Sequence, residues 1–368
     1  MYTKRNYSLK QILLWTRKDI FYFVILSTVP VILYTVFRWY WLHLPWLPIS
    51  LIGTAVAFII GFKNNASYDR LWEARKVWGG IVNTSRSLTI MLNDYVNNEH
   101  AKKILSDQEL FEIRKTFILR HIAWMSSLRH ALRTPKSWEA EPRKKTGIDY
   151  RKHLEIREQK YSLEEELKGY LSEEEKDYVL SKKNKQAACL NLQSKHLSAL
   201  KTEGYIWEFA HLEIEKMFVE LFTLQGKVER IKNFPYPRQF ATLNKFFVWI
   251  FVILLPFGMM NEFDKIGIII VESMEQYKPY PNSGFHYLIE LMGHYFIWFT
   301  VPFSVIISWV FNTMERVGEA SENPFEGEGN DVPITTMSRD IEIDIRQMIG
   351  DHENNIPKPE PEKFNTQL

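Results

Sequence analysis

Three residues at four-residue spacing, Thr54, Phe58 and Phe62, could line a path for ions. Residues four apart share one face of a helix. Several copies of this helix around an axis would therefore present a ring of hydroxyls and two rings of phenyl groups. A narrow apolar ring gates ions by dewetting. Because an aromatic ring has a positive edge and a negative face, edges turned toward the axis favour an anion and faces favour a cation.

A second stripe on the same stretch consists of the small residues Gly53, Ala57 and Gly61, also four apart. Small residues let helices approach closely inside a membrane, so this stripe predicts a helix-packing face beside the aromatic one. Both stripes also occur in helices that only pack against protein or lipid. The periodicity alone therefore leaves the pore and the packing interpretations open.

The helix that carries these stripes must pass from an apolar environment into water. No Pro and no Gly interrupts the sequence between Phe62 and Trp78, although it changes there from apolar to charged. Arg70 and Glu73 are three residues apart and can pair on a solvated or interfacial face of this helix. The sequence thus predicts one continuous helix that starts in a membrane and continues into the cytoplasm.

Four apolar stretches are long enough to span a bilayer, alone or shielded by neighbouring helices. They cover about residues 20–37, 47–62, 246–263 and 287–311. The first lacks a small-residue cleavage site after its apolar run and is expected to be a retained span rather than a signal peptide. Lys and Arg crowd before the first span and after the second, which places both termini and the long middle region in the cytoplasm.

The chain is therefore expected to be an all-α, four-span membrane protein with a large helical cytoplasmic domain. The middle region shows apolar residues at three- and four-residue spacing and no alternating strand pattern. The last segment is rich in Pro, Glu and Lys and is predicted to be disordered. The expected segments are an N-terminal segment 1–18, spans one and two 19–62, the helical domain 63–238, spans three and four 239–311, a C-terminal segment 312–349 and a disordered tail 350–368.

Composition and motifs argue against several other classes of protein. The formal net charge of +2 lacks the basic excess of a nucleic-acid binder. The sequence contains no P-loop, dinucleotide-binding turn, zinc motif or nucleophile elbow, so we expect no enzyme activity, no cofactor and no bound metal. His121 and His130 are nine residues apart, which is no metal-ligand spacing, and are expected to form hydrogen bonds within the helical domain. The lone cysteine, Cys189, cannot form an internal disulfide.

Four sequence blocks, in the same order, resemble those of bacterial bestrophin-like proteins. The first follows the second span, and the others lie in the middle region, around the third span and after the fourth. They read GFKNNASYDRLWEARKVWGGIVNTSR, RHIAWMSSLRHALR, ERIKNFPYPRQFATLNKFFVWIFVILLPFG and ENPFEGEGNDVPITTMSRDIEIDIRQM. The resemblance covers about residues 10–347, with residues 137–195 the least similar part.

This resemblance implies a homopentamer with one axial pore. It also implies that the protein lies in the lipid of the cell membrane, and we expect this to be the bacterial inner membrane. The family's neck positions fall on Thr54, Phe58 and Phe62, and its cytoplasmic aperture falls on Ile231. It implies passage of chloride or similar small anions. A monovalent-cation channel of the same fold and a membrane scaffold with a vestigial pore are the alternatives.

The resemblance departs from its animal members in one segment after the fourth span. Those members hold calcium near an uninterrupted acidic run after NPF. Here the run reads NPFEGEGND and is broken by Gly327 and Gly329, which leaves Glu326, Glu328 and Asp331 as separated carboxylates. We therefore expect gating that does not depend on calcium.

Overall fold

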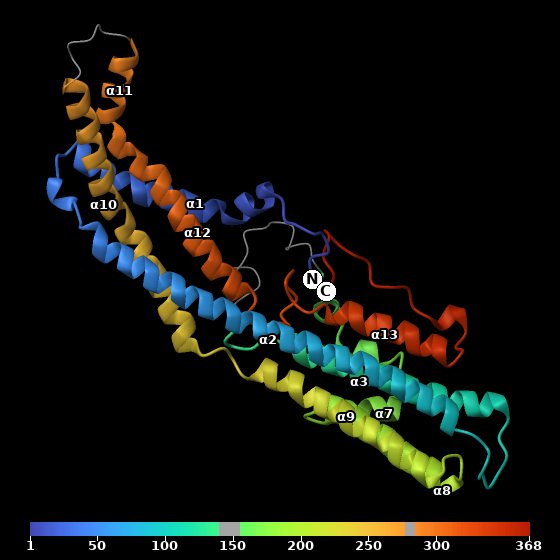
Figure 1. Ribbon diagram of the computed structural model, residues 1–368. Coiled ribbons are helices and arrows are strands. Elements are labelled where there is room, and N and C mark those ends of the chain that lie inside the picture. The colour runs from blue at the N-terminus through green and yellow to red at the C-terminus, as the bar shows by residue number, and fades with distance from the viewer. Residues whose placement is uncertain (140–154, 277–283) are drawn as a thin grey trace.

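The computed structural model describes residues 1–139, 155–276 and 284–368 (Figure 1). Within these ranges the regular structure is helical, and extended pairing is limited to isolated bridges such as Tyr2 with Thr366. The predicted all-α class is therefore confirmed. The longest helices run along one direction and give the molecule an elongated shape, with a membrane bundle at one end and a helical domain at the other (Figure 1).

The membrane bundle contains four helices that are long and apolar enough to cross a bilayer. Each of the four packs against at least two of the others. Its elements are α1 (Leu9–Thr35), η1 (Tyr40–Leu42), the first part of α2 (Trp46–Tyr95), α10 (Arg238–Gln276), α11 (Gly284–His294), η3 (Phe296–Phe299) and α12 (Thr300–Ala320).

The second of these helices, α2, is a single α-helix of 50 residues. Its one proline, Pro48, lies in the first turn, where the missing N–H has no intrahelical partner to lose. A helix of this length extends about 75 Å, more than twice the thickness of a hydrocarbon core. The prediction of one helix that leaves the membrane without a break is confirmed.

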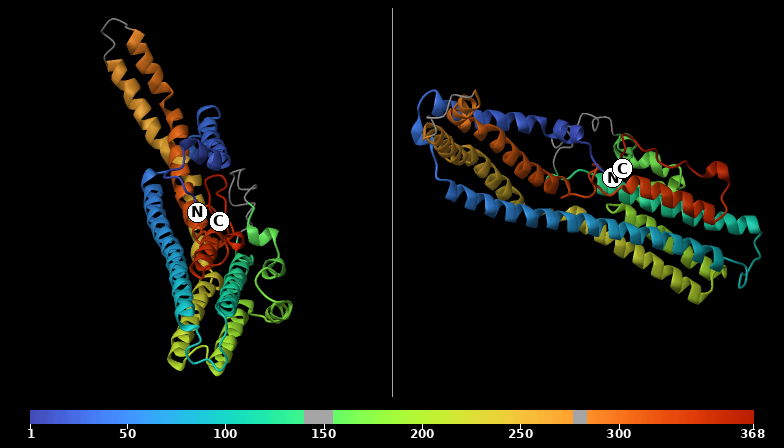
Figure 2. Two further views of the ribbon diagram at one scale, coloured as in Figure 1. Left: turned by 90° about the vertical axis from the view of Figure 1, so that its right-hand side faces the viewer. Right: turned by 45° about the horizontal axis from the view of Figure 1, so that its top comes forward.

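The fourth apolar stretch is not one helix, contrary to the predicted span 287–311. It consists of α11, the turn η3 and α12, and α12 continues to Ala320. α10 and α11 form a hairpin that projects beyond the other membrane helices (Figure 2). The two helices meet where a Cβ on Gly267 would lie 2.6 Å from the carbonyl oxygen of Gly293. An apolar run does not reveal such a change of direction, because hydropathy is the same on both sides of it.

The helical domain is built around the second half of α2, which packs against α3, α9 and α13. Its core joins buried side chains from all of these helices into one cluster. Its further elements are α3 (Asp107–Arg133), α5 (Arg157–Lys160), α6 (Leu163–Leu167), α7 (Glu173–Ser181), α8 (Lys185–Glu203), α9 (Glu208–Asn233), α13 (Ile334–Met348) and η4 (Glu353–Asn355). The prediction that residues 63–238 are helical includes residues 140–154, which lie outside the described residues.

Capping residues explain where the helices of this domain begin and end. Capping boxes, in which a serine and a glutamate three residues later exchange hydrogen bonds with the backbone, start α3 at Ser106, α6 at Ser162 and α7 at Ser172. α8 ends at Gly204, whose φ of 89° lies in the left-handed region. A Cβ there would lie 2.1 Å from the carbonyl oxygen of His100, so both the conformation and the contact require glycine.

The tail, residues 350–368, for which composition predicted disorder, makes specific contacts with the helical domain. The tail runs back along α13 and ends beside the N-terminus (Figure 1). Glu360 pairs with Arg157 at 3.0 Å and with Arg339 at 3.4 Å, and the carbonyl oxygen of Leu368 accepts a hydrogen bond from the backbone N–H of Thr336 at 2.8 Å. From composition alone, the charged residues of the tail would be expected to be solvated. In the structure, Glu360 instead pairs with arginines of α5 and α13.

Candidate functional site

The three predicted neck residues occupy one exposed face of α2 within the membrane bundle. Phe58 is 68% exposed and Phe62 is 61% exposed, and Thr54 is exposed one turn before them. The two phenyl rings meet edge to face, with centroids 4.7 Å apart and planes at 84°. The hydroxyl of Thr54 donates to the carbonyl oxygen of Ser50 at 2.9 Å, inside its own helix. The structure thus brings the three side chains together on a surface that the described residues leave exposed.

The opposite face of α2 packs against the chain's own membrane helices. Ile49, Val56 and Ile60 are buried in a cluster with Phe23 of α1 and Phe251 of α10. Burial on one face and exposure on the other fix which way the two neck phenylalanines point. The sequence stripe alone could not determine this direction, because both faces are apolar.

The small-residue stripe divides between two surroundings. A Cβ on Gly53 would lie 2.6 Å from a ring carbon of Phe251, so Gly53 allows a close approach between α2 and α10. Ala57 and Gly61 are exposed, and a Cβ on Gly61 would meet nothing within 4 Å. The stripe is therefore not one packing face within this chain.

Directly after Phe62, α2 forms a buried ion pair with α12. The Nζ atom of Lys63 lies 2.7 Å from Oε1 of Glu315, and the two side chains are 3% and 4% exposed. The neighbouring Asn64 donates from Nδ2 to the carbonyl oxygen of Met314 at 3.2 Å. Reasoning from the sequence missed this pair, although two opposite charges at the same end of two apolar runs are a readable signal for it.

Farther along, α2 contacts the end of α9 through two charged side chains. Arg70 donates to the carbonyl oxygens of Ile231 and, at 2.7 Å, of Phe234, where the helix leaves its last carbonyls without intrahelical partners. Glu73 accepts from Arg230. Arg70 and Glu73 thus bind α9 rather than pairing with each other. Together they fix the end of α9 to the helix that carries the neck.

Ile231, where the family resemblance places the cytoplasmic aperture, is buried within this chain. Its side chain is 4% exposed and faces the core together with Leu224 and Val228, which precede it at helical spacing. α9 continues to Asn233, so its core face includes residue 231. The exposed apolar side chain at this end is that of Phe234, at 64%. The aperture predicted at Ile231 stays a prediction, and within this chain the residue contributes to the core.

The segment NPFEGEGND folds into a turn above the end of α3. The carboxylate of Asp331 accepts hydrogen bonds from the backbone N–H groups of Gly327 and Glu328, at 2.6 and 2.9 Å. The buried guanidinium of Arg133 donates to the carbonyl oxygen of Phe325 at 3.0 Å. Burial and the nearby charge of Glu328 raise the pKa of Asp331 to about 6, against the opposing effect of Arg133. A fixed cation of the chain itself thus lies against this turn.

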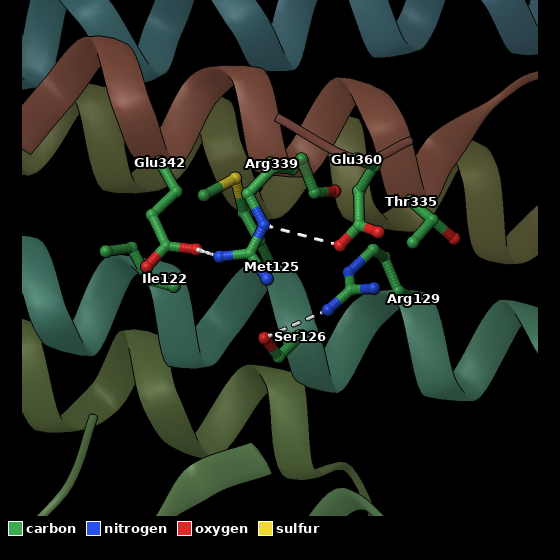
Figure 3. A pocket seen from close by; sticks show the side chains of 9 residues that line it. Ile122, Met125, Ser126, Arg129, Thr335, Arg339, Glu342 and Glu360 are labelled. Atoms are coloured by element: carbon green, nitrogen blue, oxygen red, sulfur yellow. Dashed lines mark hydrogen bonds and ion pairs between the residues drawn. The ribbon is translucent and has the colours of Figure 1, made fainter. Parts of the chain in front are cut away.

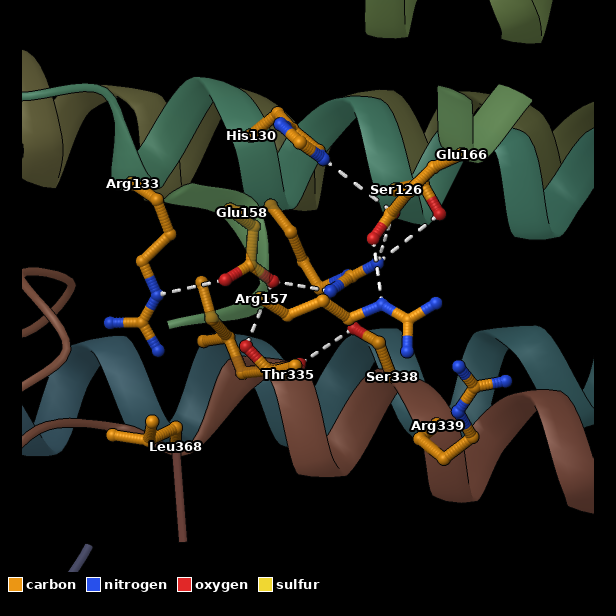
Figure 4. Close-up of polar contacts among 12 residues, drawn as sticks. Ser126, His130, Arg133, Arg157, Glu158, Glu166, Thr335, Ser338, Arg339 and Leu368 are labelled. Atoms are coloured by element: carbon orange, nitrogen blue, oxygen red, sulfur yellow. Dashed lines mark hydrogen bonds and ion pairs between the residues drawn. The ribbon is translucent and has the colours of Figure 1, made fainter. Parts of the chain in front are cut away.

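A network of charged side chains joins α3, α5, α6 and α13 (Figure 4). Arg129 donates to Glu158 and, at 2.8 Å, to Glu166, which also accepts from Arg157 at 2.7 Å. Burial alone would raise the pKa of Glu166, but His130 and the two arginines outweigh it and hold this pKa well below its usual range. The network holds the ends of several helices in one place.

The cavity between α3 and α13 is too small to be a ligand site. It measures about 10 Å³, room for about one water molecule. Figure 3 shows its lining, where Arg339 lies between Glu342 and Glu360 and crosses the gap between the helices. His121 donates to or accepts from Ser85 at 2.8 Å, and His130 lies 3.5 Å from Glu166, so both predicted histidine contacts lie within the helical domain. Among the described residues, no cluster of three or more His, Cys, Asp or Glu could hold a metal ion.

The sequence matches the profile of a family described as "Bacterial/Fungal Bestrophin protein" over residues 9–274 and 288–347. The chain belongs to the bacterial/fungal bestrophin family. These two ranges include α2 with its neck face, the end of α9 and the turn above Arg133. The resemblance drawn from the four sequence blocks is confirmed, and the family is one of channels rather than enzymes.

Two relatives carry names that state an activity. A voltage-dependent anion channel-forming protein of Ralstonia nicotianae is 28% identical over 84% of this chain and 82% of its own length. The voltage-dependent anion channel-forming protein YneE of Escherichia coli K12 is 26% identical over 82% of this chain and 76% of its own. Among solved structures, a bacterial bestrophin homologue from Klebsiella pneumoniae aligns with a TM-score of 0.69 at 23% identity, over 91% of this chain and 99% of that one. This likeness establishes the bestrophin fold.

Proposed function

We propose that this bestrophin is a homopentameric channel that passes small monovalent anions such as chloride through a pore lined by α2. The observation that carries the proposal is the exposure of Phe58 and Phe62 on one face of a helix whose other face is buried. Around a shared axis these two large phenyl groups would form the apolar constriction of a gate. We propose an anion as the permeant ion because two relatives are named anion channel-forming proteins.

Exposed apolar side chains on α2 and α9 support an assembly of several copies of the chain. α9 also leaves large apolar side chains uncovered within this chain, at Phe209, Leu212, Val219 and Phe222. On α2, Phe58 and Phe62 are likewise exposed. Copies of the chain around the axis would bury these side chains, and the family resemblance favours five copies.

We further propose that Phe234, rather than Ile231, forms a second constriction where the pore leaves the helical domain. Its side chain is exposed, and Arg70 of the pore helix holds its carbonyl oxygen. We place the protein in the cell membrane with both termini and the helical domain in the cytoplasm. The positive charges that flank the first two spans support this orientation, and both termini lie at the end of the bundle that joins the helical domain (Figure 1).

The direct test is electrical. Purified protein is incorporated into a planar bilayer under a sodium chloride gradient, and the reversal potential is measured. We expect a current that reverses near the chloride equilibrium potential, and a mass of five subunits in native mass spectrometry. Reversal near the sodium potential would establish the cation channel instead. Assembled protein without any current would favour a scaffold.

The same recording tests the dependence on calcium. Calcium prefers a compact shell of six to eight oxygen atoms. In the turn 325–331, the guanidinium of Arg133 instead binds the carbonyl oxygen of Phe325, and Asp331 is occupied by backbone N–H groups. We expect the current to change little when free calcium is varied through the micromolar range. Steep activation over that range would contradict this expectation.

A further inference from the structure

The ion pair between Lys63 and Glu315 lies at the point where the proposed neck ends. Lys63 follows Phe62 directly, yet Phe62 is 61% exposed whereas Lys63 is 3% exposed. Successive residues of a helix point about 100° apart. Phe62 therefore lies on the exposed face of α2, and the next residue, Lys63, points into the interior of the chain. The ion pair lies on the buried side of the helix.

Two charges buried at this place are costly unless their geometry is good. Removing an ammonium and a carboxylate from water costs several kcal/mol each, and an apolar pair of similar size is often as stable. Stability alone therefore does not account for the charges. An ion pair differs from apolar contacts in its direction, because the N–H group must point at the carboxylate oxygen to bind it.

The neighbouring contacts tie the same short segment of α2 to α12. Asn64 donates to the carbonyl oxygen of Met314, one residue before Glu315. A Cβ on Gly318 would lie 2.1 Å from Oδ1 of Asn64 and 3.7 Å from Cδ of Lys63. The helices approach closely here because Gly318 has no side chain. Farther into the membrane, α2 is held by apolar contacts with residues such as Phe251, which allow small rotations.

We propose that Lys63 and Glu315 are positioning residues that set the rotation of α2 about its own axis, and so keep Phe58 and Phe62 turned to the pore. This rests on the proposed function, in which those two phenylalanines form the neck. Loss of the directional contact would let α2 rotate within its apolar surroundings. The exposed face would then include residues such as Ile60, which is 3% exposed.

The chain offers a matched control one residue along α12. Arg316 pairs with Asp19, but Asp19 belongs to α1 and not to the pore helix. The guanidinium of Arg316 also lies 5.1 Å from the ring centre of Trp15, again on α1. Removing this pair changes side chains of α12 at nearly the same depth, and its two described contacts, with Asp19 and Trp15, lie on α1 rather than on α2.

The experiment measures rotation by the accessibility of cysteines to a polar, membrane-impermeant thiol reagent. Cys189, the chain's one cysteine, is buried and gives a low background. Phe62→Cys and Ile60→Cys are each combined with four backgrounds: the parent, an apolar pair (Lys63→Met with Glu315→Leu), a reversed pair (Lys63→Glu with Glu315→Lys), and the control pair (Arg316→Met with Asp19→Leu). The quantity compared is the ratio of the labelling rate at position 62 to that at position 60.

We expect the parent to label fast at position 62 and slowly at position 60. In the apolar pair this ratio should fall about tenfold, which corresponds to about 1.4 kcal/mol, while the reversed and control pairs should stay within about twofold of the parent. An unchanged ratio in an assembled apolar pair would overturn the proposal. If the apolar pair does not assemble, the reversed pair decides, since a ratio like the parent's supports the proposal and a collapsed ratio overturns it.

The labelling does not depend on conduction. A parent that labels as expected but passes no ions would overturn the channel function and leave the orientation of α2 established. If Phe62→Cys in the parent background resists labelling, the assignment of Phe62 to the neck is overturned. The proposed role of the ion pair is then overturned as well.

Discussion

Along α2, the part in the membrane bundle leaves several large apolar side chains exposed, whereas most of those in the helical domain are partly or fully buried. Leu51, Phe58 and Phe62 are 61% to 68% exposed, but Trp78 and Leu88 are fully buried. One helix thus serves two environments. In the helical domain the chain completes its own core, and in the membrane it leaves a surface for lipid or for further copies. The contrast predicts that substitutions act on folding in one region and on assembly or conduction in the other.

The largest effect is expected in the core of the helical domain. Trp78→Ala removes a fully buried indole and should lower the free energy of unfolding by about 3–5 kcal/mol. Ile104, which is 80% exposed, provides the control, since Ile104→Ala should change the free energy by no more than about 0.5 kcal/mol. Denaturant unfolding in detergent measures both. Similar values for the two variants would erase the contrast.

A second prediction concerns pH and the turn above Arg133. Because the native pKa of Asp331 is raised from 3.8 to about 6, the folded protein keeps a proton that the unfolded chain releases between these values. The contribution of Asp331 to stability is therefore full below about pH 3.8 and is lost as the pH rises through about 6, by up to about 3 kcal/mol.

The test compares the parent with Asp331→Asn, which cannot ionise, in the same pH series. The variant should lose less stability than the parent between pH 4 and pH 7, a range chosen to bracket the raised pKa of about 6. Parallel curves would mean that Asp331 titrates normally. The comparison isolates this carboxylate from the acids of the ion network, which change equally in both proteins.

A third prediction separates the two glycines of the membrane stripe. Gly53→Ala places a Cβ 2.6 Å from the ring of Phe251 and should destabilise the chain by about 1–3 kcal/mol, because the buried ring must move. Gly61→Ala meets nothing within 4 Å and should leave the fold unchanged. Thermal unfolding measures both variants.

The larger substitution Gly61→Leu sharpens this prediction. It should still leave each chain folded but should weaken the assembly, which native mass spectrometry would record as loss of the pentamer. A stable pentamer with Gly61→Leu would show that residue 61 faces an open space and not a neighbouring copy.

Substitutions at the proposed neck are expected to have the smallest effect on stability. They should nevertheless change the current. Phe58→Ala removes one of two exposed rings, so the fold should persist while single-channel conductance or open probability rises several-fold. Phe234→Ala should instead alter discrimination among anions of different size. If Phe58→Ala leaves conductance, gating and selectivity unchanged in an assembled protein, Phe58 does not line the constriction.

Much of the fold could be predicted because hydropathy and helical period are local properties of the sequence. The continuous α2, the helical middle region and the face shared by Thr54, Phe58 and Phe62 all follow from spacing. The break between α11 and α12 did not, because both sides of it are apolar. Composition predicted a disordered tail, but whether charged residues are solvated or paired depends on the residues opposite them. Composition does not contain that information.

The site was predicted less completely than the fold, for a similar reason. A residue's place in a sequence motif gives its position along the chain but not the direction of its side chain. Ile231 stands where the family resemblance indicated, yet it points into the core. Lys63 and Glu315 are 252 residues apart, and only the packing of α2 on α12 brings them together.

Residues near the two ends of this chain meet in space, and this has a consequence for its synthesis. Tyr2 forms an antiparallel bridge with Thr366, and the backbone N–H of Thr3 donates to Asn365 at 2.9 Å. A chain leaves the ribosome from its N-terminus, so Tyr2 emerges long before its partner exists. All four membrane helices must be made before the bridge can close. Until residues 365 and 366 are made, Tyr2 and Thr3 therefore lack the backbone partners that they have in the folded structure.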